Sequence, residues 1–454
     1  MKNLFFFSLF TYTNSCSHIM FSWLFYCCTP GARKVDDSAD RRRRPYEPTN
    51  ASPGTHYGSM GRLGSARGGV RSLTTNDMPE VMPSARRGND DHSSLSSTGG
   101  GVGQTYSRDE PLWRPEIKIL TYNIFIRPDL PLSSSTEYQE DRLEMFVDHV
   151  LPNYDIVCLQ EMFHVPLTSR RRILIDEAKS IGFFWHHHSS KNSYFSPTID
   201  GGLLILSKLP IVKTDFLNFD SAAFADWYAT KGVLYCLVQC GPTQGHFMHV
   251  FCTHLQATYT DETKQVSEKV RAEQISQLTV FIEKCVATSN KGPGWPIVVC
   301  GDVNVQCRTS AQDGSDSLEY QNMMKLLRKG LGARGEFIRD LAKEIDGQTH
   351  PVTYGEAHAD HRGRIHTREK SLSDLDHLTK NFENTNQSLD KMFWVPSIER
   401  EAIIKPITTS VNPMLIDRVS WDVKGNHNLS HLSDHYGIET TVAIEGIRAV
   451  GSSS

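Results

Sequence analysis

Hydrophobic residues follow two different patterns along the chain, and the change comes near residue 113. From Trp113 onward, short apolar runs typical of strands alternate with segments whose apolar residues recur at helical spacing. Helical spacing links Leu143, Phe146, Val147 and Val150 in one segment and Ile275, Leu278 and Ile282 in another. Strands are expected at 117–124, 155–160, 202–207, 232–238, 247–253, 296–300, 390–395 and 437–443. The pattern predicts a mixed α/β domain built around sheets.

The region before this domain has the composition of an unfolded chain. Residues 30–112 are rich in Ser, Gly, Arg and Pro and hold few large apolar side chains, so they cannot bury enough surface to offset chain entropy. The domain organisation expected is therefore a hydrophobic segment at 1–29, a disordered linker at 30–112, one folded domain at 113–445 and a disordered Ser-rich tail at 446–454.

Residues 4–28 are aromatic-rich and mostly uncharged, and the basic run Arg41–Arg44 follows them. The length suits a membrane-embedded segment, because about 20 helical residues cross the hydrocarbon core. Three interpretations stay open: a membrane anchor with the basic run on the cytoplasmic side, a cleaved signal peptide, or a wrongly assigned start of the coding sequence. We expect membrane association through this segment, with the compartment undetermined.

The ten cysteines show no C-x-x-C pair that suggests a zinc site. Cys158, Cys252 and Cys300 sit inside apolar runs, which is typical of small buried side chains in strands. We predict no disulfide framework.

The chain carries 48 Lys and Arg against 52 Asp and Glu. Residues 1–112 hold 13 basic and 10 acidic residues, which leaves 35 basic and 42 acidic residues for residues 113–454. A protein that grips nucleic acid through many phosphates needs a basic face. The acidic balance of the folded domain therefore argues against a nonspecific nuclease, and no nucleic-acid partner is expected.

Polar residues end the predicted strands and indicate which chemistry the protein performs. They are carboxylates, carboxamides and histidines, and strand ends at one rim of a sheet are where loops converge into a site. Each has an ordinary explanation alone, as a turn residue or a helix cap. Their order and their repeated position directly after apolar runs favour a site. They are Asn123 (TYNIF), Glu161 (CLQEM), His254 (THLQA), Asp302 and Asn304 (GDVNV), Asp390 (LDKMF), and Asp434 and His435 (SDHYGI).

Oxygen ligands without thiolates select a hard cation, Mg²⁺ or Mn²⁺, with positions left open for water and a phosphate oxygen. Such an ion neutralises charge that grows on the phosphate and on the departing oxygen. A histidine held by a carboxylate takes a proton from water near neutral pH. The set predicts phosphoester hydrolysis by direct in-line attack of water, without a covalent intermediate.

These motifs resemble those of the endonuclease/exonuclease/phosphatase superfamily from about Trp113 to Glu445. The resemblance implies a four-layer α/β/β/α sandwich with Mg²⁺, or Mn²⁺, as cofactor. It implies Glu161 as the principal metal ligand, with Asn123 beside it and Asp434 contacting metal or its water network. His435 is the implied general base and Asp390 its orienting partner. Asp302, Asn304 and His254 are implied to bind and polarise the phosphate.

Four shorter segments resemble the neutral sphingomyelinases within that superfamily. THLQA is followed by a helical stretch that contains Arg271, and DGGLLILSKLPI (200–211) and HPVTYG (350–355) match segments of those enzymes. Asp226 and Lys231, in DWYATKGVLY, match the spacing of an Asp–Lys pair that family members use to switch between resting and substrate-competent states. A surface lysine before a strand is the ordinary alternative for Lys231.

Two departures from the family pattern stand out. Lys391 replaces a residue that is usually aromatic, which puts the packing of its strand in doubt. Residues 356–388 are charged and His-rich, and we expect a solvated insertion there rather than a second metal site.

The resemblance implies a phospholipase C-type reaction on sphingomyelin or a related phosphosphingolipid, which gives ceramide and the phosphorylated headgroup. A loop just before Lys231 is expected to contact the lipid surface through its aromatic residues, and the alternative is that most of them belong to the core. They are Phe216, Phe219, Phe224, Trp227 and Tyr228. The alternatives are a nuclease or inositol polyphosphate phosphatase of the same superfamily, and an inactive lipid-binding scaffold. Headgroup preference, activation by an anionic lipid and oligomeric state are left open.

Overall fold

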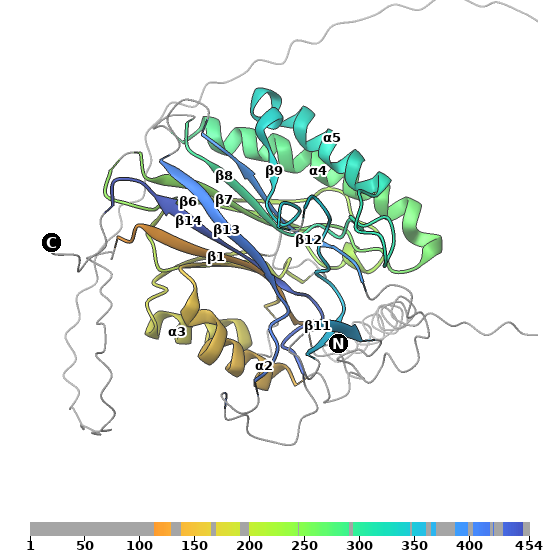
Figure 1. Ribbon diagram of the computed structural model, residues 1–454, viewed down its shortest axis with the longest axis horizontal. Coiled ribbons are helices and arrows are strands. Elements are labelled where there is room, and N and C mark those ends of the chain that lie inside the picture. Colours follow the sequence, from red (N-terminus) through yellow and green to blue (C-terminus); the bar gives the residue numbers. More distant parts are fainter. Residues whose placement is uncertain are drawn as a thin grey trace, which may run out of the picture. The chain divides into compact units, whose positions relative to one another are not determined.

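The protein is described by a computed structural model (Figure 1). The predictions for residues 1–112, including the hydrophobic segment and the linker, and for the tail after residue 447 lie outside the described residues. The described residues are 113–128, 138–164, 169–190, 199–243, 245–289, 294–345, 347–359, 365–368, 386–397, 403–417, 421 and 430–447.

Two six-stranded sheets form the centre of the domain. Sheet 1 has the order β13-β14-β1-β2-β4-β3, and sheet 2 has the order β5-β6-β7-β8-β12-β9. The strands of sheet 1 are β1 (Glu116–Ile126), β2 (Ile156–Met162), β3 (Trp185–His188), β4 (Leu204–Ser207), β13 (Ile404–Asn412) and β14 (Gly437–Ile444). Those of sheet 2 are β5 (Ile211–Asn218), β6 (Gly232–Gln239), β7 (Phe247–His254), β8 (Ile297–Asp302), β9 (Arg339–Asp340) and β12 (Asp390–Val395).

Helices cover the outer face of each sheet (Figure 1). α2 (Gln139–Met145), which continues into a π-helical turn at Phe146–Val150, and α3 (Arg170–Ser180) pack on sheet 1. α4 (Lys264–Ala287) and α5 (Leu318–Gly330) pack on sheet 2. Short 3₁₀ turns lie at Leu151–Asn153, Phe224–Trp227, Asp261–Thr263 and Gly332–Phe337.

Side-chain alternation along the strands builds three apolar layers. In β1, Ile117 and Ile119 belong to the core between the sheets, whereas Leu120 and Tyr122 face the α2/α3 layer. In β12, Met392 lies between the sheets and its neighbours face α4 and α5. Because every central strand is buried on both faces, the layers stack in the order α/β/β/α, as the sequence resemblance implied.

The predicted elements and thiols are confirmed wherever the structure describes them. All eight expected strands form, with ends shifted by no more than two residues, and both helices with helical spacing form. The seven described cysteines are free and buried: Cys158, Cys236, Cys240, Cys252, Cys285, Cys300 and Cys307. The other three lie outside the described residues.

The prediction of a solvated insertion at 356–388 is not tested. β10 (Glu356–Ala359) and β11 (Ile365–Arg368) pair there as an antiparallel hairpin, and of the other residues in the segment only 386–388 are described. One expectation is corrected. Phe216 does not lie in a loop, since it continues the alternating pattern of the edge strand β5, and Phe219 is buried in the sheet 2 core. Trp227 is 59% exposed, as expected of a surface aromatic.

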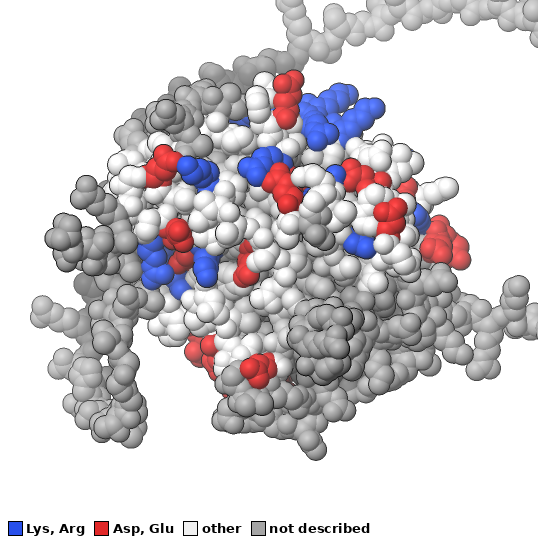
Figure 2. Space-filling model, in the orientation of Figure 1, with Lys and Arg blue, Asp and Glu red and all other residues white. Residues whose placement is uncertain are grey.

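No helix in the described part of the chain is long and apolar enough to cross a bilayer. On the face shown in Figure 2, acidic and basic side chains are interspersed among uncharged ones.

Candidate active site

Strand register brings the polar strand ends of sheet 2 together. In the parallel pair β7/β8, His254 lies opposite Asp302, and in the antiparallel pair β8/β12, Asp302 lies opposite Asp390. Three residues from distant parts of the sequence therefore occupy one row across the sheet. All three residues are buried, and none is more than 3% exposed.

Sheet 1 contributes the opposite wall. β1 and β2 run parallel, and their register places Asn123 opposite Gln160, so that Asn123 lies beside the next residue, Glu161. The Asn123 amide nitrogen donates to Glu161 Oε1 at 3.0 Å and to Asp302 Oδ2 at 3.1 Å. This amide bridges two carboxylates that come from different sheets.

His435 closes the site from the segment before β14. Its Nδ1 lies 2.9 Å from Asp390 Oδ2, and its Nε2 faces Asp302 Oδ2 at 3.8 Å and Asn123 Nδ2 at 3.4 Å. A carboxylate on Nδ1 fixes the ring orientation and leaves Nε2 directed toward the other polar groups. The arrangement is one in which Nε2 can take a proton.

The predicted Asp–Lys pair lies at the far end of the same network. Lys231 Nζ lies 3.2 Å from Asp226 Oδ1, 3.0 Å from His254 Nε2 and 2.7 Å from the carbonyl oxygen of Leu255. Both members of the pair are buried, so the alternative of a surface lysine is wrong. The ammonium group is positioned to meet an anion bound beside His254.

Asn304 and Asp434 border this network less directly. The Asn304 backbone amide donates to Asp302 Oδ1 at 2.9 Å, while its side chain donates to the Leu255 carbonyl at 3.0 Å. Asp434 is half-buried and accepts from the Ser433 hydroxyl at 3.3 Å. The structure thus brings all ten sequence-predicted residues into one region of the fold.

Burial and neighbouring charges pull the site's pKa values in different directions. Burial raises the pKa of Asp390 to about 6 although His435 opposes the shift, and burial and Glu161 raise the pKa of Asp434 although His435 opposes that shift too. Burial alone would raise the pKa of Asp302, but His435, His254 and Lys231 lower it below its usual range. Burial also works to lower the pKa of His435, and the carboxylates of Asp390 and Asp302 outweigh it and raise that pKa well above its usual value.

The donor set fits a hard cation. Single ligand atoms of Glu161, His254 and Asp302 all lie within 4.8 Å of one another, and the same holds for Asp302, Asp390 and His435. Four carboxylates of the described residues converge here. A bound cation would offset their surplus negative charge. None of the described cysteines takes part, so the ligands suit Mg²⁺ or Mn²⁺ better than a soft metal.

The backbone is strained where it presents these groups. Glu161, Asn304 and Phe125 have positive φ angles of 58°, 50° and 56°. Residues other than glycine rarely adopt this conformation, and such strain concentrates at functional sites.

Several residues that hold the site were not predicted from sequence. The Tyr259 hydroxyl donates to Asp226 Oδ1 at 2.9 Å, the Ser433 hydroxyl donates to the Asn123 carbonyl at 2.7 Å, and the Tyr354 ring packs edge-on against His435 with centroids 4.9 Å apart. HPVTYG and SDHYGI contain two of these residues, but their motifs give no sign of these contacts.

Known proteins with a similar sequence point to one group of enzymes. The endonuclease/exonuclease/phosphatase family model matches residues 120–257. A sphingomyelinase of Dictyostelium discoideum is 30% identical over 348 residues, which cover 65% of this chain and 73% of that protein. Sphingomyelinase C of Bacillus cereus is 27% identical over 226 residues, which cover 46% of this chain and 63% of that enzyme.

Among solved structures, a Staphylococcus aureus beta toxin variant with bound magnesium ions matches 72% of this chain and 99% of its own chain, at 18% identity and a TM-score of 0.47.

Proposed function

The chain belongs to the sphingomyelinase family within the endonuclease/exonuclease/phosphatase superfamily, and we propose that it hydrolyses sphingomyelin, or a related phosphosphingolipid, to ceramide and the phosphorylated headgroup. The observation that carries the proposal is the His435 Nδ1 to Asp390 Oδ2 contact of 2.9 Å, with Nε2 facing the carboxylate cluster. A paired histidine of this kind is what activation of water needs.

The arrangement of the site supports roles for four residues in the reaction. In the neutral form of His435, which is the form that acts as base, Asp390 keeps the ring proton on Nδ1, so that Nε2 accepts a proton from the attacking water. Water attacks phosphorus in line with the bond to the ceramide oxygen and that bond breaks. The departing oxygen takes a proton from solvent, and His435 returns the proton that it accepted to solvent. Lys231 and His254 hold the phosphate oxygens by charge-assisted hydrogen bonds.

Glu161, with Asn123 and Asp434 beside it, is proposed to hold Mg²⁺, for which Mn²⁺ is the alternative. When bound, the ion supplies neutralisation of the charge that grows on the phosphate and on the departing oxygen.

A membrane substrate requires a protein that meets the membrane surface. Trp227 is exposed directly beside the buried Asp226, which supports a contact of this loop with lipid. We further propose that residues 1–29 keep the protein at the membrane. Fractionation of cells that express the full chain and a chain without residues 1–29 tests this, and equal membrane recovery of both contradicts it.

To test the reaction, the full chain is purified and its hydrolysis of three substrates is measured with Mg²⁺ or with EDTA. The substrates are sphingomyelin, inositol phosphorylceramide and plasmid DNA. Ceramide release that needs Mg²⁺ supports the proposal and ranks the headgroups. We expect His435→Ala to lower kcat by about 10²–10⁴-fold, the usual contribution of general base catalysis. Cleavage of DNA in place of lipid would falsify the substrate assignment.

A further inference from the structure

The Asp390–His435 pair joins two residues that the chain places far apart. Asp390 is the first residue of β12 in sheet 2, and His435 lies two residues before β14 in sheet 1. β12 and β14 are not neighbours within a sheet, so no ladder of hydrogen bonds sets the 2.9 Å contact. Another element has to fix the distance between the two residues.

Thr353 makes contacts with the backbone on both sides of the pair. Its side-chain oxygen accepts hydrogen bonds from the backbone amides of Leu389 at 2.9 Å and Asp390 at 3.0 Å. Its carbonyl oxygen accepts from the backbone amide of Tyr436 at 2.7 Å. One fully buried residue is thus bonded to Asp390 itself and to the residue after His435.

The two residues that follow Thr353 continue the connection. The Tyr354 ring packs edge-on against the His435 imidazole, at 65° between the ring planes. The Gly355 amide donates to the Asp434 carbonyl at 2.8 Å. The segment Thr353–Gly355 therefore lies along the backbone of 434–436 while the Thr353 side chain holds the start of β12.

We propose that Thr353 is a positioning residue that sets the distance and orientation of Asp390 and His435. This inference rests on the proposed function in one respect, namely that His435 is the base of the reaction. Without the hydroxyl oxygen, the amides of Leu389 and Asp390 lose their acceptor inside the protein, and such a loss moves the backbone toward another partner. A shift of about 1 Å at a paired base costs about a hundredfold in rate.

Thr353→Val tests the proposal because it keeps the shape of the side chain and removes the oxygen. We expect kcat to fall by about 10–100-fold with KM changed by less than about twofold, which is the size of effect seen when a group that orients a reacting side chain is lost. Thr353→Ser keeps the oxygen and should restore kcat to within about threefold of wild type.

Thr440→Val is the matched control. Thr440 is equally buried, and its hydroxyl bonds to Thr409 at 3.1 Å between β13 and β14, away from the pair. It should lose stability as Thr353→Val does and keep the wild-type kcat. If both valine variants lose kcat to the same extent, Thr353 acts only through stability and the proposal is wrong.

A double variant separates positioning from any other effect on rate. In a His435→Ala background the pair no longer exists, so Thr353→Val should lower kcat no further. A further tenfold loss in that background contradicts the proposal. Should Thr353→Val fail to fold, Thr353→Ala removes the same oxygen and takes its place in the comparison.

Two further measurements test the role of Thr353 independently of which substrate the protein cleaves. Bis(p-nitrophenyl) phosphate, a soluble phosphodiester, reports His435-dependent hydrolysis even if sphingomyelin is not cleaved, in which case the proposed function fails and the Thr353 effect is still measured. The proton on His435 Nδ1 gives a low-field NMR signal when it is held by a carboxylate. We expect that signal in wild type and Thr353→Ser and not in Thr353→Val, and an unchanged signal in Thr353→Val overturns the proposal.

Discussion

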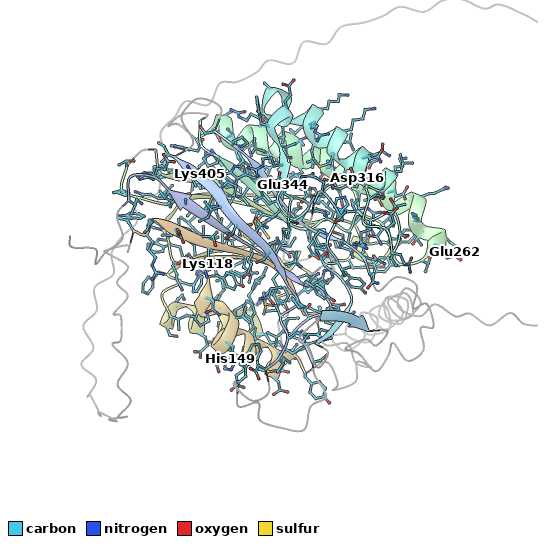
Figure 3. All side chains as sticks on the ribbon, viewed as in Figure 1. Lys118, His149, Glu262, Asp316, Glu344 and Lys405 are labelled. Atoms are coloured by element: carbon cyan, nitrogen blue, oxygen red, sulfur yellow. The ribbon has the colours of Figure 1, made fainter. Side chains whose placement is uncertain are left out.

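Strand β12 separates two groups of buried charges that are organised in opposite ways. On its inner face, Asp390 joins the site cluster, defined as Asn123, Glu161, Lys231, His254, Asp302, Asp390, Asp434 and His435. On its outer face, the next residue, Lys391, joins the lysine cluster, defined as Asp316, Tyr320, Asp340, Lys343, His350 and Lys391. Asp316 of this cluster lies beside the start of α5 (Figure 3).

In the lysine cluster, the positive and negative charges balance. Lys391 Nζ contacts His350 Nδ1 at 3.0 Å, the Ser388 hydroxyl at 3.1 Å and Asp340 Oδ2 at 3.4 Å, while Lys343 pairs with Asp316 at 2.7 Å. Burial works to lower the pKa of Lys391, but Asp340 outweighs it and the pKa is raised. The departure from an aromatic residue at this position therefore leaves β12 packed, because the buried ammonium group has its own partners.

The site cluster is not balanced, since carboxylates outnumber the cationic groups that face them. Convergent carboxylates destabilise one another, and a fold keeps such an arrangement where a cation binds or a proton moves. The contrast teaches that burial of charge by itself does not indicate function, whereas a surplus of one sign does. The three predictions that follow test this difference.

Glu161→Gln should have the largest effect and should act on activity and stability in opposite directions. We expect kcat/KM to fall about a thousandfold or more, because stabilisation of charge by a bound ion is worth several kcal/mol. The melting temperature in EDTA should rise, because one of the mutually repelling carboxylates is neutralised. Activity assays and thermal unfolding in EDTA measure both.

Glu439→Gln is the control for that variant, because Glu439 lies on β14 and accepts from Tyr154 and Ser410 outside the site cluster. It should keep the wild-type activity and gain no stability in EDTA. A lower melting temperature in EDTA for Glu161→Gln would show that the site cluster is as balanced as the lysine cluster.

Lys391→Met should act on stability and leave the chemistry nearly intact. Removing one partner of a buried ion pair costs about 3–5 kcal/mol of unfolding free energy, because Asp340 is left charged without its counterpart. Urea unfolding measures this loss, and kcat at low temperature should stay within about tenfold of wild type.

The double variant Lys391→Met/Asp340→Asn checks the reason for that loss. Removing both charges should recover more than half of the lost unfolding free energy, since no unpaired charge is then buried. If the double variant is less stable than the single one, packing rather than charge explains the effect of Lys391.

The smallest effect is a pH dependence of stability that arises at His350. Burial and Lys391 lower the pKa of His350 to about 4, although Asp340 and Asp316 oppose the shift. The unfolded chain binds a proton at a pH of about 6.5, before the folded state does, so stability is lost as the pH falls from about 6.5 to about 4. Below a pH of about 4 the loss is complete, and His350 causes no further change of stability with pH.

The stability difference between wild type and His350→Gln, measured by urea unfolding at several pH values, should therefore shrink as the pH falls through this window. A difference that stays constant between pH 6.5 and pH 4 means that folding does not lower the pKa of His350.

Sequence alone determined the order of the central strands along the chain and the identity of the site residues. Strands buried on both faces are continuous apolar runs, and the polar residue that ends each run is visible because it interrupts the pattern. Edge strands β3, β5, β9 and β13, the β10/β11 hairpin and helices α3 and α5 were missed. β3 consists of Trp185 and three histidines, and β5 has no fully buried residue, so neither has a strong apolar signal.

The tertiary structure decided which of those residues meet. Register across β7, β8 and β12 sets His254, Asp302 and Asp390 in one row, and packing of the two sheets adds Asn123 and His435. Register and sheet packing depend on contacts between residues that are far apart in the sequence, such as Asn123 and His435 at a separation of 312 positions, which no local pattern records. The same reason hides Thr353, because only the fold brings its side-chain oxygen to the backbone amide of Asp390.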